Sequence, residues 1–281
     1  MKTLLESLKN SITEAVDVNN MTAEDWCYEY GNDNSACIDH KGGVLLSDRF
    51  IIGEDTPLVD GHLPALDFHF DDDTDNPTVT INTTKFRSFE NFPKADNLRL
   101  IIKKSAIKSF NALTGINRLY LEIYDPSLKT VDTNIIIGGL RISDKCSSII
   151  PNLKGLTFDT YGTAKVLRIE FDTARTADIH KFFTQNRFYY PIDFTCFSPV
   201  RDIDCLININ AEIDTIHFLP DLDAAKTGDL HRYNALFDPK LNKTLRRIGV
   251  LYKNYDAYKK FADNLEAKMH EVNPKVIVDM S

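Results

Sequence analysis

A short phrase, typically two apolar residues separated by one other residue, recurs along the middle of the chain. It occurs at intervals of 18 to 27 residues, at 79–81, 98–100, 119–121, 140–142, 167–169, 188–190 and 206–208. One short strand per period of roughly 20 to 29 residues is typical of leucine-rich-repeat solenoids, whose units bury their apolar edges against one another. The pattern predicts an α/β, leucine-rich-repeat-like solenoid with short parallel strands over residues 77–220.

Two kinds of element precede the repeats. Residues 1–18 place apolar side chains on one face at helical spacing and predict an amphipathic amino-terminal helix. Residues 19–76 predict a helical and hairpin cap. Within it, Thr22 and Asp25 resemble a capping box that opens a second helix, and Gly42 and Gly43 supply the turn of a hairpin.

Residues 221–281 follow a different pattern. A strand at 248–252, a helix at 256–269 and a strand at 276–278 predict one βαβ unit. Its helix has an apolar stripe for burial, made of Tyr258, Phe261, Ala262, Leu265 and Met269. We expect this unit to close the carboxyl end of the solenoid, because terminal repeats need a cap.

The residues between the apolar positions of each strand define a candidate binding surface. Because strand side chains alternate, these residues face away from the core, onto the concave sheet. They include Arg99, Tyr120, Arg141, Arg168 and Tyr189. Arginine and tyrosine are enriched in protein interfaces, so we predict that this column binds a protein partner through acidic groups. The alternative is a solvated β-face without a partner.

The charge distribution and the cysteine content indicate in which cellular compartment this protein is expected. Residues 1–97 carry 19 acidic against 7 basic side chains, whereas residues 98–281 carry 22 against 26. The five cysteines are odd in number and lack zinc-site spacing, which indicates reduced thiols. No long apolar run and no secretory signal pattern is found, so we expect a soluble protein that is intracellular or packaged inside a particle, without a membrane partner.

Catalytic signals are weak. Asp67 and His69 occupy same-face strand positions before the acidic run 71–76, which suggests a metal-dependent hydrolase or nuclease as one alternative. That run lacks the glycine and the bidentate glutamate of an EF-hand loop. No phosphate-binding glycine loop or zinc-protease spacing occurs. We therefore predict a protein that is not an enzyme and needs no metal or other cofactor.

Basic residues gather near the carboxyl end, with tyrosines among them. They are Lys243, Arg246, Arg247, Lys253, Lys259, Lys260 and Lys268. Phosphate contacts with ring stacking would suit nucleic acid. Acidic residues share the same helix and the chain has a pI near 5.4, so a solvated face is favoured and nucleic acid is not an expected partner.

The order of these features resembles the irregular leucine-rich-repeat-like proteins of tailed bacteriophages. The resemblance rests on the amino-terminal helix, the Trp26 segment, the hairpin at 38–44, and segments 63–68 and 88–93. It departs from the family because no asparagine ladder follows Leu100 or Leu121. The helix is also similar to capsid-targeting peptides, and residues 12–14 fit an apolar-x-Glu cleavage rule. The resemblance implies a location in the host cytoplasm or the virion interior, and it makes a virion or head-assembly protein an alternative to the protein-binding module.

Overall fold

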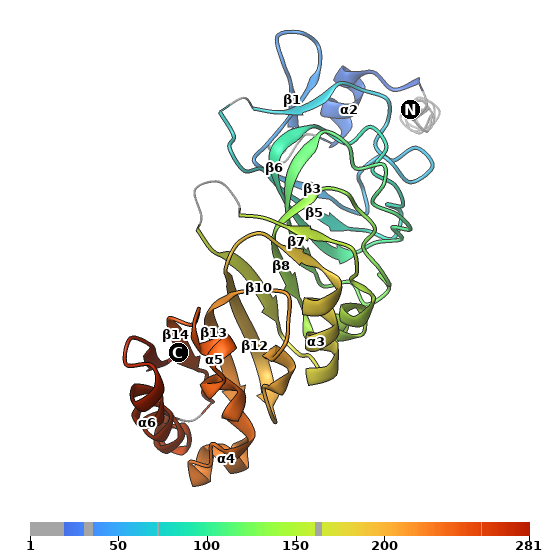
Figure 1. Cartoon of the computed structure of the whole chain (residues 1–281). Helices are drawn as coiled ribbons and strands as arrows, with labels where there is room; N and C mark the ends of the chain where they lie inside the picture. Colours follow the sequence, from blue (N-terminus) through green and yellow to red (C-terminus); the bar gives the residue numbers. More distant parts are fainter. Residues whose placement is uncertain (1–19, 31–35, 72, 161–164, 254) are drawn as a thin grey trace, which may run out of the picture.

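The computed structural model describes the chain except residues 1–19, 31–35, 72, 161–164 and 254. The predicted helix at 1–18 lies outside the described residues. Figure 1 shows one continuous progression of elements from α2 near one end of the molecule to α6 at the other.

A small amino-terminal layer comes first. It contains helix α2 (Ala23–Tyr30) and a three-stranded sheet of β1 (Ala36–Ile38), β2 (Val44–Leu46) and β4 (Phe68–Phe70). The predicted capping box is confirmed, because the Asp25 amide donates to Thr22 Oγ1 at 3.1 Å and the Thr22 amide donates to Asp25 Oδ2 at 3.0 Å. The hairpin is confirmed as well. β1 and β2 pair antiparallel, and Gly42 takes the positive φ of 84° that its turn requires.

The main sheet is open, and each neighbouring pair along its path is parallel. Its path, in order, is β3 (Arg49–Ile52), β5 (Thr78–Asn82), β6 (Ala95–Lys104), β7 (Ile116–Ile123), β8 (Ile136–Ile142), β10 (Leu167–Phe171), β12 (Ile192–Val200), β13 (Ile213–Pro220), β14 (Arg247–Val250) and β15 (Ile277–Met280). The α/β class is confirmed. The first five repeated phrases lie in β5, β6, β7, β8 and β10, as their alternation predicts.

The last two phrases do not form strands of this path, so that part of the prediction is wrong. At 188–190 only Phe188 is in a strand, the two-residue β11 (Arg187–Phe188), which pairs with β9 (Thr157–Phe158). Phe188 instead stacks on Phe158 at 4.9 Å between ring centroids. At 206–208 the chain leaves the 3₁₀ helix η3 (Asp204–Leu206), and Asn208 has a left-handed φ of 59°, which interrupts extended backbone.

Helices cover one face of the main sheet. They are α3 (Thr176–Gln185), α4 (Leu222–Thr227), α5 (Pro239–Asn242) and α6 (Tyr255–Val272), with 3₁₀ helices η2 (Asp144–Asn152) and η4 (His231–Phe237). α3 lies along one side of the sheet, and α6 lies at the carboxyl-terminal end (Figure 1). The predicted βαβ unit is confirmed as β14, α6 and β15, and all five residues of its predicted stripe are buried. This unit extends the sheet by two strands.

Candidate functional site

The face of the main sheet opposite the helices, called the open face below, carries two rows of aligned residues. The strands pair in register, so side chains at matching positions lie side by side across the sheet. The first row is Thr78, Arg99, Tyr120, Gly139, Arg168, Asp193, Thr215, Arg247 and Ile277. The second row is Thr80, Ile101, Glu122, Arg141, Glu170, Thr195, His217, Gly249 and Asp279.

The structure brings together four of the five residues predicted for the binding surface. Arg99, Tyr120 and Arg168 share the first row, and Arg141 lies in the second. Tyr189 does not join them, and its predicted place in the column is wrong. It lies in a bend after β11, is 66% exposed, and precedes the main-sheet strand that starts at Ile192.

Gly139 makes room for the Tyr120 ring beside the next strand. A Cβ atom at Gly139 would be 2.3 Å from Tyr120 Cε2, closer than van der Waals contact allows. On the other side of the ring, the Arg99 guanidinium lies 5.6 Å from the ring centroid, within cation–π range. The ring is therefore held between β6 and β8, and Gly139 is the residue that makes room for it.

Glu122 is a buried carboxylate that fixes Arg99. Arg99 Nε donates to Glu122 Oε1 at 2.7 Å, and Nη2 donates to the same oxygen. Tyr124 Oη donates to Glu122 Oε2 at 2.9 Å. Burial, followed by this hydrogen bond to Glu122, raises the pKa of Tyr124 to about 12. The Arg99 side chain is nonetheless 51% exposed while that of Glu122 is 5% exposed, so the cation lies above the anion.

Glu170 and Asp172 perform the same task for the other two arginines. Arg141 Nη2 donates to Asp172 Oδ1 at 3.3 Å, and its Nη1 lies 3.7 Å from Glu170 Oε2. Arg168 Nε lies 3.9 Å from Glu170 Oε1. The Arg141 guanidinium also lies 5.9 Å from the ring centroid of Phe197, which is 42% exposed. The predicted arginines thus lie above carboxylates. The sequence prediction, which was based on outward arginines and tyrosines, did not include these carboxylates.

Two carboxyl groups on the open face are held in unfavourable surroundings. Burial is the largest cause of the raised pKa of Glu170 and of Asp193. The carboxylates of Asp193 and Glu122 further raise the pKa of Glu170, and that of Asp214 further raises the pKa of Asp193. Asp193 Oδ1 is buried and has no hydrogen-bond partner in the described part of the chain, and His217 Nε2 lies 3.9 Å away from it. Perturbed carboxyl groups gathered on one surface are typical of functional sites.

Asp193 makes a prediction about pH and stability. Its raised pKa means that the folded state binds more protons than the unfolded state between the ordinary value of 3.8 and the raised one. The free energy of unfolding therefore falls as pH rises through this window. We expect Asp193→Asn to be more stable than the wild type at neutral pH, with a difference that shrinks toward about pH 3.5. Thermal melts of both proteins across pH measure this, and a constant difference would contradict it.

A hollow opens among the first-row residues at the β5 side of the sheet. Its volume is about 360 Å³, and it is lined by Asn76, Thr78, Arg99, Tyr120 and Arg168. Each of these side chains can donate a hydrogen bond, and none carries a carboxylate. Among the described residues, the Arg168 guanidinium and the Tyr120 hydroxyl make no hydrogen bond, and the Arg168 side chain is 61% exposed. Donors on this face are therefore available to a ligand.

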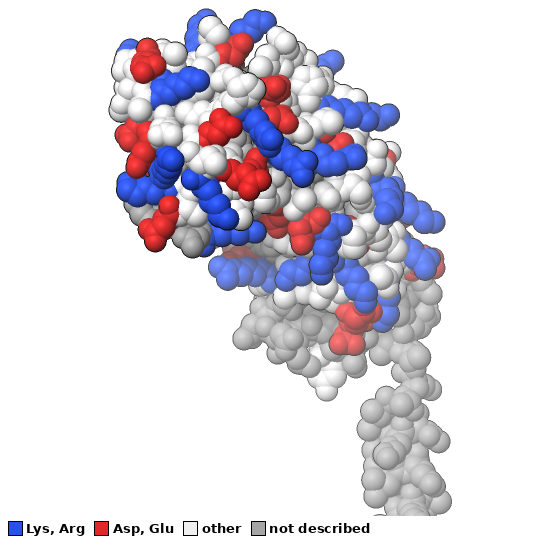
Figure 2. Space-filling view, turned by 90° about the horizontal axis from the view of Figure 1, so that it is seen from below, with Lys and Arg blue, Asp and Glu red and all other residues white. Residues whose placement is uncertain are grey.

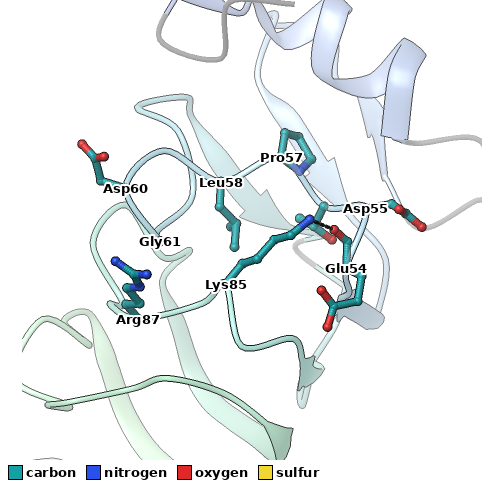
Figure 3. Close-up of a pocket in the computed structure, with 9 residues that line it drawn as sticks. Glu54, Asp55, Pro57, Leu58, Asp60, Gly61, Lys85 and Arg87 are labelled. Carbon is teal, nitrogen blue, oxygen red and sulfur yellow. Dashed lines mark hydrogen bonds between the residues drawn. The ribbon is translucent and has the colours of Figure 1, made fainter. Parts of the chain in front are cut away.

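A larger pocket of about 560 Å³ lies beside the loop after β3. The Lys85 side chain crosses it, and its Nζ donates to the Glu54 carbonyl at 2.5 Å. Lys104 Nζ lies 2.8 Å from the Glu54 carboxylate. Figure 3 shows Asp55 and Asp60 at opposite ends of this pocket, pointing away from one another. Because its polar groups do not converge, the pocket has no arrangement suited to one ligand group.

The residues suggested for a hydrolase are arranged differently from the prediction. His69 Nε2 lies 3.1 Å from Asp39 Oδ2, while its Nδ1 faces the Asp67 carbonyl, so the Asp67 carboxylate is not the partner. Gly43 accommodates this ring, since a Cβ there would be 2.9 Å from His69 Cε1. Within the described part of the chain, no group of three or more His, Cys, Asp or Glu side chains could hold a metal ion.

Of the seven basic residues named near the carboxyl end, three have acidic partners within the described chain. Arg246 Nε lies 3.2 Å from Asp214, Arg247 binds Asp279, and Lys259 Nζ lies 3.1 Å from Asp263. Figure 2, which views the molecule from below, shows basic and acidic side chains interspersed over that face rather than a continuous basic patch. In the described segments, no helix has the length and apolar character needed to cross a bilayer.

Comparisons of this chain with family models, curated proteins and solved structures found no match. The resemblance to bacteriophage proteins therefore stays a prediction, and function has to be argued from the open face itself.

Proposed function

We propose that this chain is a noncatalytic protein-binding module. In this proposal the chain is a leucine-rich-repeat-like solenoid, and the open face of its main sheet is the binding surface. The partner is a protein with acidic side chains, and it lies across the open face. Arg99, Arg141 and Arg168 donate to its carboxylates, and Tyr120 supplies contact area.

The observation that carries this proposal is the layering of charge on the open face. Arg99 and Arg168 are 51% and 61% exposed, whereas their partners Glu122 and Glu170 are 5% and 16% exposed. A partner therefore meets guanidinium groups first, although the neighbouring carboxylates balance them. Arginines already fixed by ion pairs lose less side-chain entropy when they bind, which favours affinity.

A protein suits this surface better than a small molecule. The two rows cross nine strands of the sheet and offer a broad surface rather than a deep cavity. Arginine and tyrosine are the residues that dominate binding energy in protein interfaces. Cation–π contacts further hold Arg99 over Tyr120 and Arg141 over Phe197.

Arg168→Glu tests the proposal. Reversing this charge places a carboxylate beside Glu170 and removes the least engaged cation, so we expect the affinity for the partner to fall at least about tenfold. Affinity capture from the native source identifies the partner, and titration of the purified pair measures the loss. Arg168 is the better target than Arg99 or Arg141, because each of those is hydrogen-bonded to a carboxylate of the chain.

Arg187→Glu is the matched control. Arg187 is exposed on β11, outside the main-sheet path, so this variant changes net charge equally and should bind the partner like the wild type. Equal binding by the Arg168 and Arg187 variants would contradict the proposed site.

A further inference from the structure

The hollow at Arg168 is lined by side chains that suit the binding of a single carboxylate. Its five lining side chains are all hydrogen-bond donors, and two of them are arginines on either side of Tyr120 in the first row. Arg168 contributes Nη groups that make no hydrogen bond among the described residues. A planar guanidinium with both outer nitrogens available matches a carboxylate in a two-bond geometry.

Glu170 is the group that such a carboxylate would disturb. It lies below Arg141 and Arg168, at 3.7 Å and 3.9 Å, and both distances exceed that of a hydrogen bond. In the described chain no hydrogen bond fixes its carboxylate, whereas Glu122 has three donors from Arg99 and Tyr124. Glu170 is thus held by electrostatic attraction alone, in a site where its side chain is only 16% exposed.

The arginines of the open face are already matched by carboxylates of the chain. Arg99, Arg141 and Arg168 lie beside Glu122, Glu170 and Asp172, and Asp193 lies beside His217 and Arg247. A further carboxylate drawn to Arg168 would compete with Glu170 for the same cation. The added negative charge costs the least free energy if Glu170, the weakly held carboxylate beside Arg168, becomes protonated.

We infer that the hollow binds an Asp or Glu side chain of the partner and that Glu170 takes up one proton from solvent when it does. This inference rests on the proposed function. The proton forms an O–H bond on a carboxylate oxygen of Glu170, and the partner's carboxylate replaces Glu170 as the anion beside Arg168.

The groups that face Glu170 decide how it titrates. Arg168 lies on Glu170's own strand, Arg141 on the neighbouring β8 and Asp193 on the neighbouring β12, while Glu122 and Tyr120 act from β7, one strand further away. His217 acts on Asp193 rather than on Glu170 directly. Burial already raises the pKa of Glu170, and the nearby Asp193 and Glu122 add to this effect, while Arg141 and Arg168 oppose it. A second anion at Arg168 removes part of that opposition, so the bound state holds the proton more tightly.

The coupling between proton uptake and binding determines whether affinity rises or falls with pH. Because the bound state carries one more proton at Glu170, affinity increases as pH falls, by at most about tenfold per pH unit. We expect an acetylated and amidated hexaglutamate peptide to bind about threefold to tenfold more tightly near about pH 6 than near about pH 7.5. Both values lie well above the ordinary pKa of glutamate side chains in the peptide.

Titration calorimetry with this peptide, in two buffers of different ionisation enthalpy, counts the protons taken up. The wild type should take up a fraction of a proton approaching one, and Glu170→Gln should bind with no uptake and a flat pH profile. Glu266→Gln removes an exposed carboxyl group of α6, on the helix side of the sheet, so it is the matched control and should keep the pH dependence.

The outcomes separate the two proposals. Binding that depends on Arg168 but takes up no proton overturns the role of Glu170 and leaves the proposed function in place. Uptake that persists in Glu170→Gln also overturns it. If neither the peptide nor the captured partner depends on Arg168, the proposed function itself fails. Thermal melts of each variant establish that the fold is intact, and the glutamine side chain preserves the shape of glutamate.

Discussion

Replacing Phe182 by alanine is expected to lower the free energy of unfolding by about 3–5 kcal/mol. Phe182 is fully buried in α3, and its ring lies 5.2 to 5.9 Å from the rings of Phe158, Phe171, Phe183 and Phe188. Removing it forfeits apolar burial and leaves a cavity among four aromatic rings that cannot collapse together easily. Urea unfolding followed by circular dichroism measures the loss.

Tyr189→Ala is the matched control for this substitution. It also removes an aromatic ring, but Tyr189 is 66% exposed, so we expect a change within about 0.5 kcal/mol. A loss below about 1 kcal/mol for Phe182→Ala, or an equal loss for both variants, would show that this aromatic cluster does not support the fold.

The aromatic cluster matters for the open face because it holds β10 from behind. Phe171 belongs to β10 and packs against Phe182 on the helix side, while Arg168 and Glu170 of the same strand point to the other side. Alternation within a strand thus links the core to the candidate site. A fold loosened at Phe182 should therefore lose binding as well, and the partner assay must be read beside the stability of each variant.

Alternation also explains which parts of the site the sequence predicts. A period of two identifies Arg99, Tyr120 and Arg168 as outward residues, and the same rule places Glu122 and Glu170 on that face two residues further along their strands. The signal for the carboxylate layer was therefore present in the sequence. What the sequence alone does not provide is strand register, which brings Glu122 of β7 within reach of Arg99 on β6.

The failure at 188–190 and 206–208 has a physical cause. Between β10 and β12 the chain forms α3 and then β11, so this unit is longer than the units that connect β5, β6, β7 and β8. Phe188 faces the aromatic core, and the main strand begins only at Ile192. Apolar residues at the expected spacing therefore mark burial without marking a strand, an ambiguity common to short apolar segments.

Gly139→Ala is expected to weaken partner binding at least about tenfold while leaving every charged group of the site unchanged. The new methyl group would lie 2.3 Å from Tyr120 Cε2, so the ring has to leave its place over β8. A moved ring also loses its position 5.6 Å from the Arg99 guanidinium and changes one wall of the hollow. Because only a side-chain end has to move, we expect a stability loss of about 1 kcal/mol.

Gly53→Ala separates this effect from the general consequence of adding a methyl group to a glycine. A Cβ at Gly53 meets nothing within 4 Å, so this variant should bind and unfold like the wild type. Titration with the captured partner and with the hexaglutamate peptide measures the two interactions independently. Unchanged affinity of Gly139→Ala for the partner would remove Tyr120 from the interface. If Gly139→Ala loses affinity for the partner but keeps its affinity for the peptide, the Tyr120 ring contributes contact area to the partner and Arg168 binds the carboxylate. Only the larger ligand would need both residues.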